Sequence, residues 1–282
     1  MDTPPLLLDS LGSRWVRYKT ELKNCHDDFS EEAVHDFRVA ARRLLASLDL
    51  LRTVIPGAKI KRMRRILKDQ LDNLDELRDA QVMLAEISEN IQQIESLKPF
   101  EEYLLRREKK LMRAARREIK SLKIGELAKR IRKLKESIVE SQPDGLDPLP
   151  AVDEAYAGVI RRYERVDATR PVTIHRLRIA FKKFRYMVES IHPILEGFPE
   201  DTLKRMHDYQ TSMGEIQDME VALHEFAKFE KTAPKGYDPE PVRAYYKENH
   251  ALAISRYLEG RSEVLSFWRP APDQPFPKEN QS

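Results

Sequence analysis

The chain has 282 residues, of which 34% are charged, and its 50 Lys and Arg residues nearly balance 47 Asp and Glu residues. No run approaches the roughly 20 apolar residues that a membrane-spanning helix needs. The first residues lack the basic and then apolar pattern of a signal peptide, so we expect a soluble, cytoplasmic protein without membrane contact. The single cysteine, Cys25, excludes an intramolecular disulfide framework and a thiolate metal cluster.

Composition and periodicity predict an all-α fold. Only nine glycines are present, and apolar residues recur at helical rather than alternating spacing. In chain order, the expected helices span residues 11–27, 31–54, 59–94, 100–121, 126–140, 151–166, 171–192, 201–230 and 242–268. Residues 141–150 contain three prolines and one glycine and predict a linker, and the Pro-rich residues 270–282 predict a flexible tail.

The most informative feature of the sequence is a segment that occurs twice. Residues 34–48, VHDFRVAARRLLASL, return at 174–188 as IHRLRIAFKKFRYMV, at a constant shift of 140 positions. The matched pairs are His35 and His175, Arg38 and Arg178, Arg42 and Lys182, Arg43 and Lys183, and, just beyond, Asp49 and Glu189. The histidine and the basic positions therefore recur together.

A second repeated pair follows in the same order. Residues 74–82, LDELRDAQV, return at 213–221 as MGEIQDMEV, at a shift of 139 positions. Its acidic positions match Glu76 to Glu215 and Asp79 to Asp218. Two repeats at nearly the same shift indicate an internal duplication. We therefore expect a single domain made of two similar halves, residues 11–140 and 151–269.

The repeated polar residues share one face of each helix, at about 100° per residue. In the first copy the apolar residues on the opposite face are Phe37, Ala41, Leu44, Leu48 and Leu51. In the second copy they are Leu177, Phe181, Phe184, Val188 and Ile191. Each histidine thus heads a cationic stripe on an amphipathic helix, and the stripe is not the side that faces the core.

The doubled His-x-x-Arg-x-x-x-(Arg/Lys)-(Arg/Lys) helix, each copy followed by a charged helix with an acidic cluster, resembles the CHAD family, the conserved-histidine α-helical domain. The resemblance covers roughly residues 11–269. It implies an all-α fold of two similar four-helix-bundle halves, related by a pseudo-two-fold axis and enclosing a basic central cavity or channel. It also implies binding of inorganic polyphosphate and, in a bacterium, a location on polyphosphate granules.

Several basic stripes supply candidate contacts to such a polyanion, because Arg donates bidentate hydrogen bonds to phosphate and Lys acts as a point charge. The candidate polyphosphate-binding residues are His35, Arg38, Arg42, Arg43, Lys61, Arg64, Arg65, Lys68, Arg106, Lys110, Arg113, Arg117, His175, Arg178, Lys182, Lys183, Lys204 and His207. The basic start of the second charged helix is thinner than that of the first, and which half dominates binding is left open. No catalytic residue, metal site or cofactor is predicted.

The repeated histidines and acids also admit other interpretations. His35 and His175 are predicted either to hydrogen-bond a carboxylate or carbonyl at an interface, or to contact phosphate. A metal-ligand role is disfavoured because neither has a His or carboxylate partner at the i+3 or i+4 spacing of helical metal sites. The repeated acidic residues are expected to form salt bridges or orient arginines, rather than to bind a divalent metal.

Three other functions are alternatives to polyphosphate binding. A phosphohydrolase is disfavoured because the chain lacks a P-loop and the Glu-x-Glu-x-Lys motif of the CYTH-type domain that accompanies some relatives. Nucleic-acid binding would be only non-specific, since no recognition module or aromatic platform is evident. A helical scaffold for protein partners is the third alternative. The main hypothesis is a non-enzymatic binding protein.

Overall fold

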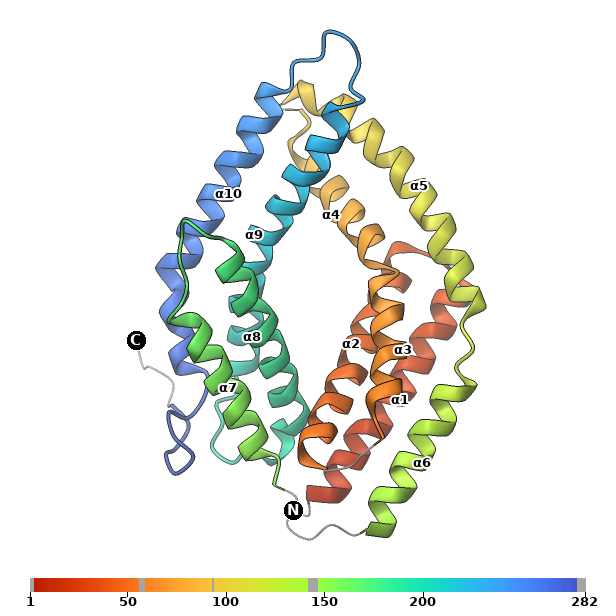
Figure 1. The fold of residues 1–282 in the computed structure, drawn as a ribbon, viewed down its shortest axis with the longest axis vertical. Coiled ribbons are helices and arrows are strands. Elements are labelled where there is room, and N and C mark those ends of the chain that lie inside the picture. The colour runs from red at the N-terminus through yellow and green to blue at the C-terminus, as the bar shows by residue number, and fades with distance from the viewer. Residues whose placement is uncertain (1–2, 56–58, 93, 142–146, 278–282) are drawn as a thin grey trace.

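The computed structural model describes residues 3–55, 59–92, 94–141 and 147–277. Within these ranges its regular structure is helical throughout (Figure 1), which confirms the predicted all-α fold. The first half contains α1 (Thr3–Asp27), α2 (Glu31–Val54), α3 (Lys61–Asp72), α4 (Asp75–Asn90), the 3₁₀ helix η1 (Glu95–Leu97), α5 (Lys98–Ser121) and α6 (Gly125–Ser141). The second half contains α7 (Leu149–Tyr163), α8 (Val172–Ile191), η2 (His192–Ile194), α9 (Thr202–Glu230), α10 (Glu240–Gly260) and η3 (Arg261–Ser266). None of the helices in the described ranges combines the length and the apolar character that crossing a bilayer requires.

The two repeated helices, α2 and α8, form as their sequences predict. The hydroxyl of Ser30 caps α2 by accepting a hydrogen bond from the backbone N–H of Ala33 at 3.2 Å. Glu31 and Glu32 follow in the first turn, where negative charge is favourable. All the apolar residues predicted to face the core are buried, in α2 as in α8. The predicted apolar faces are therefore confirmed.

Matched helices of the two halves make matched contacts. α2 packs on α1 and α3, just as α8 packs on α7 and α9, and α4 packs on α5 as α9 packs on α10. The pseudo-two-fold axis itself stays a prediction. α6 is an addition to the first half, where it lies against α1 and α3. Its apolar side is buried there through Leu127, Ile131, Leu134 and Ile138.

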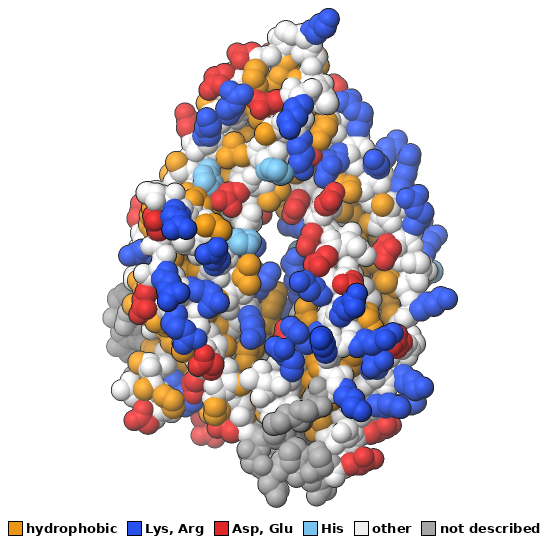
Figure 2. All heavy atoms as spheres, in the orientation of Figure 1, with side chains coloured by type: hydrophobic (Ala, Val, Ile, Leu, Met, Phe, Trp, Pro, Cys, Tyr) orange, Lys and Arg blue, Asp and Glu red, His pale blue; other side chains and the backbone are white. Residues whose placement is uncertain are grey.

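The two halves are joined at two places (Figure 1). Near one end α2 packs on α8, and near the other α4 and α5 pack on α9 while α10 contacts η1. The second junction has its own hydrophobic core, which we call the upper cluster. It consists of Met83, Ile87, Leu97, Phe100, Leu104, Ala222, Phe226, Phe229, Val242 and Tyr246. Between the two junctions the molecule is hollowed at its centre (Figure 2).

The helix predicted over residues 59–94 is in fact two helices, and this prediction was wrong. α3 ends at Asp72 and α4 begins at Asp75, whereas the repeat of this segment forms the unbroken helix α9. The apolar residues continue at helical spacing on both sides of the break, so the sequence pattern gives no sign of it. The break is stabilised from α2, because the Arg38 guanidinium donates a hydrogen bond at 3.1 Å to the carbonyl of Leu71 in the last turn of α3.

The segment after Arg269 makes a contact that the sequence pattern does not predict. The ring of Phe276, within the predicted flexible tail, packs edge-on against the rings of Phe198 and Trp268. As far as residue 277, this segment lies against the second half. Two predicted features fall partly outside the described residues, namely the linker (residues 142–146 of 141–150) and the end of the tail (residues 278–282).

Replacing Phe100 by Ala should lower the free energy of unfolding by about 3 to 5 kcal/mol, the range for deleting a buried aromatic ring. Phe100 is fully buried, and its ring contacts those of Phe226, Phe229 and Tyr246 in the other half. Chemical denaturation followed by circular dichroism measures the change. Leu105→Ala is the matched control, because this side chain on the same helix is 49% exposed. Equal losses in the two variants would contradict the role of the upper cluster as a junction.

Candidate functional site

Four repeated cations meet where α2 packs on α8, and we call them the central cationic cluster. Arg38 and Arg42 come from α2, and Arg178 and Lys182 occupy the matching positions of α8. The pKa of Lys182 is lowered to about 8, first by burial and then by the guanidinium groups of Arg42 and Arg178. Figure 2 shows Lys and Arg side chains gathered beside the central hollow. The predicted cationic stripes of the two halves are thus brought together.

The first-half members of this cluster are held by a carboxylate. Arg38, only 3% exposed, donates from Nη2 to Oδ1 of Asp75 at 2.6 Å as well as to the Leu71 carbonyl. Nη2 of Arg42 lies 3.9 Å from the same carboxylate oxygen. Asp75 therefore offsets the charge of the first copy and ties α2 to the junction of α3 and α4.

The second-half members have no such partner. Within the described part of the chain, the side chains of Arg178 and Lys182 form no hydrogen bond or ion pair, and Nε of Arg178 is buried. Burial lowers the pKa of Arg178, and the nearby charge of Asp218 opposes that effect. Like charges repel more strongly in surroundings of reduced dielectric than in water. An anion placed between these side chains would relieve the repulsion.

Two repeated carboxylates, Asp79 on α4 and Asp218 on α9, lie within electrostatic range of the cluster. Burial raises the pKa of both, and the neighbouring charges of Asp75 and Asp218 raise the pKa of Asp79 further. Figure 2 shows Asp and Glu side chains at the upper rim of the hollow. Among the described residues, no group of three or more His, Cys, Asp or Glu is arranged to hold a metal ion. Of the remaining repeated acids, Glu76 forms an ion pair with Arg107 at 2.9 Å.

The histidines are not brought into this cluster by any described contact. The side chains of His35 and His207 are exposed and make no hydrogen bond or ion pair in the described ranges. His175 is partly buried, and its buried Nδ1 has no hydrogen-bond partner. The interfacial hydrogen bond considered for these histidines is therefore absent from His35 and from Nδ1 of His175.

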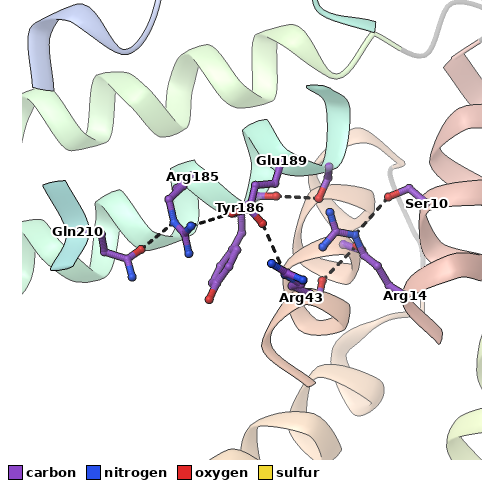
Figure 3. Close-up of polar contacts among 9 residues, drawn as sticks. Ser10, Arg14, Arg43, Arg185, Tyr186, Glu189 and Gln210 are labelled. Atoms are coloured by element: carbon purple, nitrogen blue, oxygen red, sulfur yellow. Dashed lines mark hydrogen bonds and ion pairs between the residues drawn. The ribbon is translucent and has the colours of Figure 1, made fainter. Parts of the chain in front are cut away.

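Two other predicted residues, Arg43 and Lys204, lie in a separate cleft with a volume of about 780 Å³, which we call the basal cleft. Its lining comes from α1, α2, α8, η2 and α9, and includes Arg14 and Arg17, which sequence reasoning did not select. The sequence offered one sign of Arg14 and Arg17 as surface cations, namely that both lie off the apolar stripe of the first helix. Figure 3 shows Glu189 beside this cleft, accepting from Arg185 at 2.8 Å and lying 3.9 Å from Arg43.

The remaining predicted cations have no described contact with the central cationic cluster. On α3, Arg64 forms an ion pair with Asp49 of α2, and Arg65 lies 3.7 Å from Asp69 of its own helix. The other side chains are exposed, and they are Lys61, Lys68, Arg106, Lys110, Arg113, Arg117 and Lys183. Figure 2 shows the basic residues of α5 along the outer edge of the molecule. A part for them in binding stays a prediction.

Comparison with known proteins gives this arrangement a family. A sequence profile described as the CHAD domain matches residues 8–227, a range that contains both repeated segments. The chain belongs to the CHAD domain family. Its fold is similar to that of the crystal structure of the CHAD domain from the plant Ricinus communis, with a TM-score of 0.67 and 18% identity over 94% of this chain and 89% of that chain. At this identity the likeness extends to the fold alone. No curated protein matches the chain.

In this CHAD domain, replacing Lys182 by Met should raise the free energy of unfolding near pH 7 by roughly 1 to 3 kcal/mol, because a charge buried among arginines is removed. Folding lowers the pKa of Lys182 from 10.5 to about 8. Between these values the unfolded chain binds more protons, so the unaltered protein gains stability as the pH rises through this window. The advantage of the variant should therefore shrink between pH 8 and 10.5.

Urea denaturation of both proteins across this pH range measures the difference. Cys25 and several tyrosines titrate in both proteins, so only the difference between the two reports on Lys182. Lys183→Met is the matched control, since its side chain is exposed and should add no pH dependence. A difference that stayed constant from neutral to alkaline pH would show that the pKa of Lys182 is not lowered by folding.

Proposed function

We propose that this protein binds inorganic polyphosphate, an elongated polyanion, in the hollow between its two halves and does not act on it as an enzyme. The observation that supports this function is the meeting of four cations at the contact of α2 and α8, two of which have no described anionic partner. Buried charges are strongly destabilising when unpaired. A bound polyanion would supply the missing partners.

The arrangement favours an extended anion over a compact one. The basal cleft presents further cations, Arg14, Arg43 and Lys204, beside the same pair of helices. A chain of phosphate groups could contact both places, and the mixture of Arg and Lys would hold it without selecting a sequence. Asp79 on α4 and Asp218 on α9 would repel an anion that lay against those two helices. We therefore place the ligand on the side of α2 and α8.

Nucleic acid fits this surface less well than polyphosphate. Single strands are bound by aromatic side chains that stack on the bases next to a basic groove. Here the large aromatic residues are taken up by the core, as Trp268 and Phe181 illustrate by their complete burial. Tyr186, near the basal cleft, is covered by the guanidinium of Arg185 at 4.7 Å. In a bacterial cytoplasm, binding of this kind would direct the protein to polyphosphate granules.

The double variant Arg42→Glu, Lys182→Glu should bind long-chain polyphosphate at least about a hundredfold more weakly, because two favourable charge interactions become repulsive. Isothermal titration calorimetry near physiological salt measures the affinity, and a repeat at higher salt should show weaker binding through loss of counterion release. Lys231→Glu, Lys235→Glu is the matched control, since it makes the same change of charge at exposed positions after α9.

Single-stranded DNA of equal charge should compete only weakly for the bound polyphosphate. Equal competition, or equal losses in the central and control variants, would show that binding is generic to a charged surface. The polyphosphate recovered after incubation is sized on a gel, and shortened chains would overturn the proposal of binding without hydrolysis.

A further inference from the structure

The two copies of the repeated helix differ in how their first arginine is neutralised. Arg38 has two partners, the carboxylate of Asp75 at 2.6 Å and the carbonyl of Leu71 at 3.1 Å. Both partners lie at the break between α3 and α4, so this arginine depends on a local irregularity of the chain. Its charge and two of its nitrogens are already committed within the protein.

Neither partner exists for Arg178. The residue that matches Asp75 in the second copy is Gly214, which has no side chain to accept a hydrogen bond. The position that matches Leu71 is Gln210, in the middle of the unbroken helix α9, where the backbone carbonyl is used by the helix itself. The second copy has thus lost both the carboxylate and the helix break at which the Leu71 carbonyl accepts from Arg38.

The glycine also sets the place of the Arg178 guanidinium. A Cβ atom at position 214 would lie 3.5 Å from its Nη2 and 3.7 Å from its Nε, so the guanidinium lies close to the backbone of α9. Its Nε is buried without a hydrogen-bond partner. In folded proteins the great majority of buried donors have a hydrogen-bond partner. An unsatisfied guanidinium is suited to an oxyanion, which it can bind through two parallel hydrogen bonds.

A second ion pair of the first copy is also missing from the second. In the first copy Asp49 is paired with Arg64. At the shift of 139 positions that matches Asp75 to Gly214, the counterpart of Arg64 is Leu203, which carries no charge. Figure 3 shows Glu189, the counterpart of Asp49, engaged instead with Arg185 and Arg43. Neither of these two ion pairs of the first copy is therefore repeated in the second.

We propose that the centre of the molecule holds one oxyanion subsite rather than two, formed by Arg178 and Lys182 with Arg42 facing them, while Arg38 is a structural tie. Lys182 lies one turn beyond Arg178 on the same face of α8, and neither side chain forms an ion pair with any described residue, although the charge of Asp218 on α9 is near Arg178. Arg42 is only loosely paired, at 3.9 Å from Asp75. The ligand of this subsite is a tetrahedral oxyanion such as one phosphate group, and its place within a longer chain rests on the proposed function.

The variant Gly214→Asp tests the subsite by restoring the carboxylate that the first copy has. The new side chain would start at ordinary contact distance from the Arg178 guanidinium and should pair with it. Affinity for tripolyphosphate and for long-chain polyphosphate should fall about tenfold or more. The thermal midpoint of the ligand-free protein should stay level or rise, because a buried donor gains its partner.

Gly214→Asn is the matched control, since it adds the same volume without the charge, and its affinity should stay within about threefold of the unaltered protein. Arg178→Met provides a second variant in case Gly214→Asp does not fold, and it should lose affinity with an unchanged circular dichroism spectrum. Arg38→Met should show the opposite pattern, a lower thermal midpoint with an affinity for tripolyphosphate that is retained below that midpoint.

The result that would overturn the subsite is an unchanged affinity in Gly214→Asp and Arg178→Met together with a loss in a folded Arg38→Met protein. Failure of the proposed function has a different signature, in which the unaltered protein prefers long-chain polyphosphate no more than DNA of equal charge. Even then, a thermal midpoint that tripolyphosphate raises in the unaltered protein and in Gly214→Asn, but not in Gly214→Asp, would support the subsite.

Discussion

Cations of both copies crowd together where α2 packs on α8, and each copy must limit the repulsion that results. Two unit charges about 4 Å apart repel by roughly 1 kcal/mol in water and by about four times as much near a protein surface. The first copy meets this by internal neutralisation, since Asp75 lies against Arg38 and near Arg42. In the second copy the side chains of Arg178 and Lys182 have no described ion pair, and Figure 2 shows Lys and Arg side chains beside a hollow rather than inside a packed core.

The hollow exists because the two halves contact each other at two separate junctions and not along the length between them. A single junction between α2 and α8 would leave the long helices free to close on each other. The upper cluster prevents this by joining α4 and α5 to α9 and α10 (Figure 1). Polar contacts reinforce that junction, for the hydroxyl of Tyr103 donates to Glu225 at 2.8 Å and that of Tyr246 to Glu86 at 3.0 Å. The same contacts fix α4 and α9, and with them the carboxylates that face the cationic side.

Sequence reasoning predicted the all-α fold and the buried faces of α2 and α8, because amphipathic periodicity determines which face of a helix packs on its neighbours. It could not find the break after Asp72, since the apolar phase is unaltered there and the decisive contact comes from Arg38, 33 positions away. Arg42 and Arg43 were both candidate residues, but neighbouring residues on a helix point about 100° apart, and Arg43 lies in the basal cleft. Counting basic residues could not decide which half dominates binding, because a count does not register which cations are already paired.

Pairing rather than number therefore decides where an anion is bound in a duplicated protein of this kind. If the arginines of both copies were paired with a carboxylate, as Arg38 is with Asp75, no donor at the centre would remain for a ligand. If both copies had a glycine at this position, as the second has, the central cations would repel one another without a paired carboxylate, and the ligand-free fold would lose stability. With one arginine paired to a carboxylate and the other left unpaired, the protein keeps the stability of its ligand-free fold and still has a donor for a ligand. The exchange of Asp75 for Gly214 between matched positions is sufficient to produce that difference.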